Sequence, residues 1–310
     1  MSRSYANGGG GDHAGGETDV LQTVLEGQPV VLLAAAYMRR ARTLARAARP
    51  VGVWRQLSFA AGLAVICAAI GTPVASLGED LQVAHMVQHI LLGDIAAVLL
   101  VLGLTRPLLQ PVLAAPGLRH LRLLANPILA IVLWIVSLYG WHLPVLYEAA
   151  ARHPIVHALE HASFLGAGIA MWAAILGPLP KPTWFTGLPQ LLYVFLMRAS
   201  GAVLANIFIW SQTPFYPTYV ATAQNRGVEP MTDQNLAGAV LMIEGSLLTF
   251  GVFAWLFFTW MRNDQERQEL LELAAARGIE LDEQRARRAI VAGRGGLLRE
   301  RVEGSGHERP

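Results

Sequence analysis

Two pairs of histidines are the residues best suited to chemistry in this chain. His85 and His89 are four positions apart, and so are His157 and His161. On an α-helix, residues four apart lie about 40° from each other around the axis, so each pair presents both imidazoles on one face. Imidazole is a ligand for copper, zinc, iron and nickel, and this spacing therefore predicts a metal site.

Two more histidines and a carboxylate are candidates for the same site. His142 and His153 precede the second pair, and Glu160 is expected on the helix face that also carries His153. Three roles are open for Glu160. Its carboxylate could bind the metal, accept the second N–H of a metal-bound imidazole, or form an ion pair with Arg152.

The cysteine content limits which other ligands could take part. Cys67 is the only cysteine among 310 residues, which excludes an intramolecular disulfide and any paired-thiolate motif. A metal would therefore rely on imidazole, carboxylate or thioether. A thioether from Met86 or Met231 would favour Cu(I).

The composition predicts a membrane protein that crosses the bilayer several times. Hydrophobic residues make up 54% of the chain and charged residues only 15%, which is far more apolar than an average soluble domain. The net charge of +2 is too small to indicate a nucleic-acid partner, so we expect none. The lipid bilayer is the expected surrounding.

Seven apolar stretches are expected to be transmembrane helices, because about 20 residues of helix cross the hydrocarbon core. They lie at about residues 19–38, 56–75, 83–104, 127–141, 154–176, 188–210 and 236–261. The first is the weakest, since Glu26 and Gln28 interrupt it. The sequence thus predicts an all-α polytopic membrane helix bundle over residues 19–262.

The two ends of the chain are expected to lie outside this bundle. Residues 1–18 are rich in glycine and polar residues and are predicted to be a disordered leader. Residues 263–292 are predicted to form a cytoplasmic amphipathic helix with a break at Gly278, and residues 293–310 a disordered tail.

The loop charges predict the orientation of the bundle. Arginines gather in residues 39–55 and 106–122 and in the tail after Arg262, and cytoplasmic loops carry such an excess. The N-terminus is therefore expected outside and the C-terminus in the cytoplasm. This places His85, His89, His142, His153, His157 and His161 at the outer membrane boundary. Two helical pairs at equal depth favour one shared metal site over separate interfacial histidines.

Three charged residues are expected near the middle of the membrane. Asp94, Arg198 and Glu244 lie inside the third, sixth and seventh predicted spans. Unpaired charges at this depth cost several kcal/mol, so Arg198 is predicted to pair with Asp94 or Glu244. A structural ion pair and a path for protons or metal both remain open.

Enzymatic alternatives use the same histidines. His157 to His161 matches H-x-x-E-H, in which two histidines bind zinc and the glutamate is the general base of a peptidase. A di-metal enzyme with histidine boxes is the other possibility. The first pattern fixes only three positions, and the second class needs more histidines than this chain has.

The chain resembles the CtaG-type cytochrome c oxidase assembly factors over about residues 30–261. The most specific segments are residues 85–89, 141–147 and 153–161, and the weaker ones are 177–180, 214–219 and 233–238. The resemblance implies a multi-pass protein of the bacterial inner membrane that supplies copper to the oxidase. Its implied partners are oxidase subunits, the copper-bearing one above all.

We therefore expect an assembly factor, or metallochaperone, rather than a catalyst. Copper is the expected metal, bound at the outer face by the histidines above. The alternatives are a membrane metalloenzyme and a metal-free scaffold for oxidase subunits. Because a metallochaperone must hand its ion to a partner, an accessible site is expected.

Overall fold

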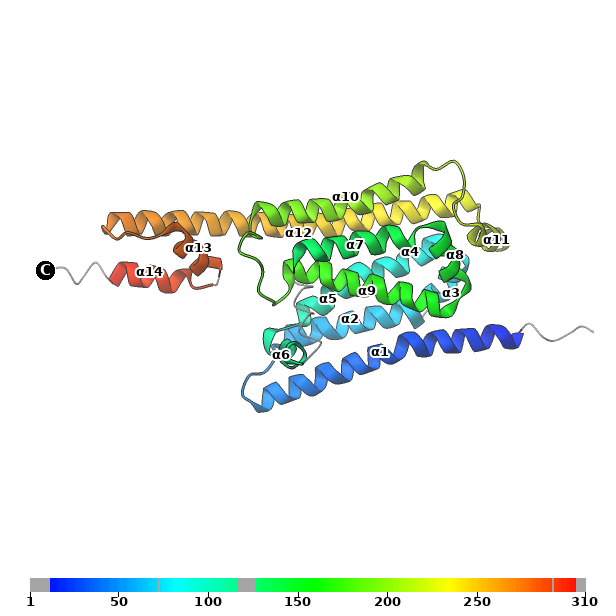
Figure 1. Ribbon diagram of the computed structural model, residues 1–310, viewed down its shortest axis with the longest axis horizontal. Helices are drawn as coiled ribbons and strands as arrows, with labels where there is room; N and C mark the ends of the chain where they lie inside the picture. The colour runs from blue at the N-terminus through cyan, green and yellow to red at the C-terminus, as the bar shows by residue number, and fades with distance from the viewer. Residues whose placement is uncertain (1–11, 72, 116–125, 292, 305–310) are drawn as a thin grey trace, which may run out of the picture. The chain divides into compact units, whose positions relative to one another are not determined.

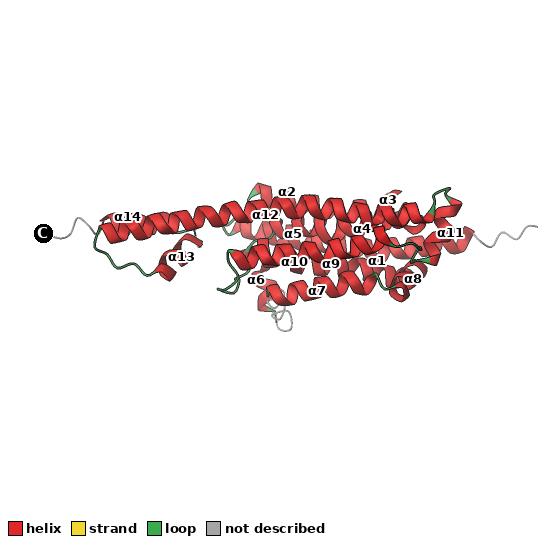
Figure 2. Cartoon of the chain, turned by 90° about the horizontal axis from the view of Figure 1, so that it is seen from above, coloured by secondary structure: helices red, strands yellow, loops and turns green. Residues whose placement is uncertain are grey.

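The computed structural model describes residues 12–71, 73–115, 126–291 and 293–304, with side chains from residue 27 onward. These residues form helices joined by loops, and the described part contains no strand (Figure 2). The elements are α1 (Asp12–Arg46), α2 (Val53–Gly71), α3 (Pro73–Asp80), α4 (Gln82–Ile90), the π-helix η1 (Leu91–Ala96), α5 (Ala97–Gly103), α6 (Arg106–Ala114), α7 (Pro127–Trp141), α8 (Pro144–Arg152), α9 (Pro154–Leu176), α10 (Leu188–Trp210), α11 (Pro217–Asn225), α12 (Pro230–Ala276), α13 (Glu283–Val291) and α14 (Gly295–Gly304).

Among the described residues, five helical segments are long and apolar enough to cross a membrane. They are α2, the continuous segment Gln82–Gly103 formed by α4, η1 and α5, and the helices α9, α10 and α12. A sixth arises if α7 and α8 together form one broken span. The helix α1 contains the first predicted stretch but is not among the five, since polar residues dilute its apolar run.

The bend between α7 and α8 follows from the local sequence. Asn126 caps α7, its side-chain oxygen accepting a hydrogen bond of 2.9 Å from the N–H of Ile128. Pro144 begins α8 and cannot continue the hydrogen bonding of α7, so the two helices meet at 73°. His142 occupies this bend as the C-cap of α7.

The chain divides into two compact units, and the larger one comprises Met1–Phe185 and Phe195–Leu247. In this unit α9 packs against η1, α5 and α7, and α2 packs against α5 (Figure 1). A Cβ added to Gly168 would lie only 2.0 Å from the carbonyl oxygen of Gly93, so glycine is needed for α9 to approach η1 this closely. The third and fifth predicted spans, which carry the two histidine pairs, are therefore neighbours.

The smaller unit comprises Thr186–Val194 and Leu248–Pro310. Here α12 continues past the expected membrane boundary to Ala276, and the chain then turns at Gly278 with φ of 65°. Leu270, Ala286 and Leu298 belong to one apolar cluster shared by the end of α12, α13 and α14. Through this cluster α14 packs as a helix within residues 293–310, where the sequence predicted a disordered tail. At the N-terminus of the chain, α1 begins at Asp12, inside the predicted leader. Residues 1–11 and 305–310 lie outside the described residues.

Candidate metal site

His85, His89 and Glu160 form the centre of the candidate site. Two oxygens of one carboxylate face two imidazoles: Oε2 of Glu160 lies 3.5 Å from Nε2 of His85, and Oε1 lies 3.4 Å from Nε2 of His89. One ligand atom from each residue lies within 4.8 Å of the other two. All three side chains are buried, and Glu160 is 0% exposed.

The distances in this group suit a shared metal ion better than hydrogen bonds. A nitrogen–oxygen hydrogen bond is usually about 2.7–3.2 Å long. Two ligand atoms on one tetrahedral ion, each at about 2.0–2.2 Å from it, lie about 3.3–3.6 Å apart. In the described part of the chain, Nε2 of His85, Nε2 of His89 and both oxygens of Glu160 have no hydrogen-bond partner. Buried polar atoms of this kind call for a partner such as a metal ion.

Three further histidines surround this centre. The ring centroid of His157 lies 5.4 Å from that of His85, and the His161 centroid lies 5.8 Å from that of His89. His142 lies 5.8 Å from His89, also between ring centroids. Its Nδ1 lies 2.6 Å from the carbonyl oxygen of Leu138, which leaves Nε2 as the nitrogen able to reach an ion.

His153 does not join the cluster, although the sequence analysis included it. It is exposed at the N-cap of α9, in an extended backbone conformation with φ of −130° and ψ of 114°. The expected position on the α9 face assumed a helical backbone at this residue. The structure thus gathers five of the six predicted histidines: His85, His89, His142, His157 and His161.

Of the three roles considered for Glu160, the geometry favours that of a metal ligand and does not fit the ion pair with Arg152. Arg152 forms its ion pair with Glu148, one turn earlier in α8, and not with Glu160. The carboxylate of Glu160 instead faces the histidine pair of α4. In a peptidase of the H-x-x-E-H type the glutamate would act on water beside its own two histidines, so this orientation does not favour that alternative.

The helix α4 is held in place from outside its own sequence. Leu81 offers no side-chain cap, but the carboxylate of Asp233 accepts hydrogen bonds of 2.7 Å from the N–H of Gln82 and 3.0 Å from that of Val83. The side chain of Gln88 donates a hydrogen bond of 3.0 Å to the carbonyl of Ala69 in α2. These contacts fix the depth and rotation of the helix that presents His85 and His89.

Three tyrosines cover the cluster. The ring centroid of Tyr147 lies 5.1 Å from that of His85, and the Tyr219 centroid lies 5.9 Å from it. Tyr216 stacks on Tyr147 with centroids 3.8 Å apart, and its hydroxyl donates to the carbonyl of His142. Since all five clustered histidines and Glu160 are buried, the expectation of an accessible site is wrong for this conformation.

The three intramembrane charges lie in the larger unit but do not form the predicted ion pair. Arg198 donates to the carbonyl oxygen of Met242 at 2.7 Å and to the hydroxyl of Ser246 at 2.9 Å. Asp94 accepts a hydrogen bond of 3.2 Å from the indole N–H of Trp172. No ion pair joins Arg198 to Asp94 or Glu244 in the described part of the chain, since backbone and hydroxyl acceptors satisfy the guanidinium instead.

Sequence reasoning assigned no role to Asp233 or to the covering tyrosines. All of them lie in the segments on which the family resemblance depends, Tyr147 in residues 141–147, Tyr216 and Tyr219 in residues 214–219, and Asp233 in residues 233–238. Membership in these segments was the one feature of the sequence that could have indicated a role for these residues. Their contacts with α4 span large sequence separations, so local spacing could not reveal them.

Fold and site together define a class: a polytopic helical membrane protein with a buried histidine–carboxylate cluster. Residues 35–263 match the family described as cytochrome c oxidase caa3 assembly factor (Caa3_CtaG), and the chain belongs to this family.

Two relatives of the chain come from mycobacteria. They are the uncharacterized protein Mb0105 of Mycobacterium bovis and the uncharacterized protein MT0111 of Mycobacterium tuberculosis. Each is 26% identical over 269 residues, which cover 78% of this chain and 39% of the relative. The chain therefore spans well under half the length of these relatives. No solved structure matches the chain.

Proposed function

We propose that this protein binds copper in the buried cluster and helps to assemble the copper centre of cytochrome c oxidase. The observation that carries the proposal is the placement of the Glu160 carboxylate 3.5 Å from His85 and 3.4 Å from His89. His142, His157 and His161 supply further imidazoles around it. The protein acts as an assembly factor and not as a catalyst.

Two observations lead us to propose copper: the ligand groups of the cluster and the family to which the chain belongs. Imidazole and carboxylate groups suit copper but also zinc and iron, so the donors alone do not select the metal. Membership of an oxidase assembly family favours copper, which the oxidase needs. Copper is then cargo, and its acceptor is the copper-bearing oxidase subunit.

The burial of the cluster has a consequence for transfer. An ion bound among these histidines is shielded by Tyr147, Tyr216 and Tyr219. Loading and release then require α8 or α11, the short helices that carry Tyr147 and Tyr219, to move. Docking of the oxidase subunit on α8 and α11 would move these helices when copper is transferred.

The topology proposed is the one that the loop charges indicate. Seven crossings result if α1 and the α7–α8 pair cross the membrane in addition to the five long apolar segments. The N-terminus is then outside, the C-terminus is in the cytoplasm, and the histidine cluster is near the outer face of a bacterial inner membrane.

The test is oxidase maturation in cells that carry only a variant protein. His85→Ala with His89→Ala should lower the amount of copper-loaded oxidase at an unchanged level of the variant protein. His153→Ala is the matched control, because this histidine is exposed outside the cluster. Normal maturation with the double variant would favour the metal-free scaffold instead.

A further inference from the structure

A basic cavity lies at the opposite end of the membrane segment that carries His85 and His89. It has a volume of about 620 Å³ and lies between the end of α1 and the start of α6. Arg40, Arg49 and Arg106 line it, together with the polar side chains of Thr43 and Gln110. None of the described residues that line it is acidic.

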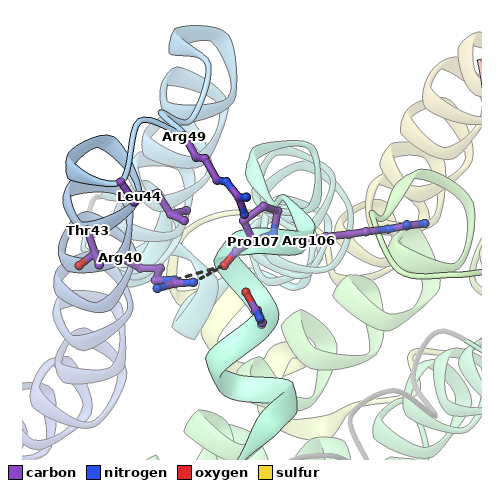
Figure 3. Close-up of a pocket in the computed structure, with 8 residues that line it drawn as sticks. Arg40, Thr43, Leu44, Arg49, Arg106 and Pro107 are labelled. Atoms are coloured by element: carbon purple, nitrogen blue, oxygen red, sulfur yellow. Dashed lines mark hydrogen bonds between the residues drawn. The ribbon is translucent and has the colours of Figure 1, made fainter.

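Among the described residues, no carboxylate forms an ion pair with the arginines of this cavity. Nε and Nη2 of Arg40 donate to the carbonyl oxygen of Pro107 at 3.2 and 2.9 Å, and Arg106 donates to that of Pro178 at 2.6 Å. Arg49 forms no ion pair or side-chain hydrogen bond within the described part of the chain. Figure 3 shows Arg40 and Arg49 both directed toward Pro107, whereas Arg106 extends away from them. Both of these arginines therefore line the same cavity.

Exposed apolar residues on α1 and α2 are suited to contact with a membrane. The segment Gln82–Gly103 begins near the histidine cluster, and α6 starts at Arg106 just after its other end. Trp54 at the start of α2 is 83% exposed, which is typical of an aromatic residue at a membrane interface. On α1, Val31 and Leu32 are exposed about two helical turns before Arg40 and can contact acyl chains.

We propose that this cavity binds the phosphate group of an anionic phospholipid. Arg40 and Arg49 would contact the phosphate oxygens, to which arginine offers several N–H donors in a fixed fork. The exposed apolar side chains of α1 would contact the acyl chains. A water-soluble phosphate compound offers the same anion but gains nothing from these apolar residues, so the lipid is the occupant that fits.

The experiment measures lipid binding to the purified full chain in uncharged detergent by native mass spectrometry. The probes are phosphatidylglycerol, phosphatidylcholine and inorganic phosphate. We expect phosphatidylglycerol to bind more tightly than phosphatidylcholine, and Arg40→Gln with Arg49→Gln to weaken its binding by about fivefold for each arginine removed. Arg39→Gln with Arg46→Gln is the matched control, since it removes two exposed arginines of α1 that do not line the cavity.

Three results would overturn the proposal: equal weakening in both double variants, no preference for phosphatidylglycerol, or inorganic phosphate binding as tightly as the lipid. If the first double variant is unstable, Arg49→Gln alone replaces it, because the Arg49 side chain forms no hydrogen bond or ion pair in the described part of the chain and its one bond there, from the backbone N–H to Leu44, is kept. That single variant should still bind phosphatidylglycerol about fivefold more weakly.

Discussion

The carboxylate of Asp233 in α12 accepts a hydrogen bond of 2.7 Å from the backbone N–H of Gln82, the first residue of α4. A second bond of 3.0 Å comes from the N–H of Val83. The first N–H groups of a helix have no partner within it and carry its positive dipole end, so a carboxylate there is favourable. Through this contact the start of α12 positions the helix that carries two of the five clustered histidines.

Asp233→Ala should therefore loosen α4 and weaken metal binding. The variant leaves the buried N–H of Gln82 and the half-buried N–H of Val83 without their acceptor, at a cost of about 1–2 kcal/mol. We expect faster amide hydrogen exchange in residues 82–90 and a lower copper content of the purified protein. Glu229→Ala is the control, because its carboxylate accepts from Met231 and Thr232 and not from α4. Unchanged exchange in α4 of the Asp233 variant would contradict this role.

Asp94→Asn should leave the level of the protein and oxidase maturation normal. The amide oxygen of asparagine can accept the hydrogen bond that Trp172 now donates to Asp94. Arg198 needs no charge at Asp94, since it bonds to Met242 and Ser246. Asp94→Leu should instead destabilise the protein by about 1–3 kcal/mol, because the buried indole N–H loses its acceptor. Failed maturation with a normal level of the asparagine variant would indicate a proton or metal path through Asp94.

Lys181, in the loop after α9, should make stability depend on pH. Burial lowers its pKa from 10.5 to about 8, although its ammonium donates to the carbonyl of Ile175. The folded protein then binds fewer protons here than the unfolded chain between pH 8 and 10.5. Stability therefore rises with pH across this window, by about 1–2 kcal/mol between pH 7.5 and 9.5. Thermal unfolding at both pH values checks this, and a rise of equal size in Lys181→Met would assign it to other groups.

The apolar pattern predicted the bounds of three helices closely. The stretches 127–141, 154–176 and 188–210 coincide with α7, α9 and α10, because proline or a capping side chain marks where α7 and α9 begin and Gly177 follows the end of α9. Composition could not reveal the π-helix η1 inside the third stretch. It also could not show that the charged segment after Met261 continues α12.

The candidate site was predicted in part. Helical spacing predicted that His85 shares a helix face with His89, and His157 with His161. In the structure, the packing of α9 on η1 brings the two pairs together. The orientation of Glu160 depends on the close approach at Gly93 and Gly168, which joins residues far apart in the sequence. His153 was misplaced because a residue at a helix cap does not follow helical periodicity.

Copper analysis of purified protein tests the central claim most directly. The wild-type chain and the His85→Ala, His89→Ala variant are loaded with copper, dialysed and analysed for copper per chain, with helix content compared by circular dichroism. The geometry around Glu160 predicts that the wild type retains copper and that the equally helical variant loses most of it. Equal copper in both proteins would contradict the site.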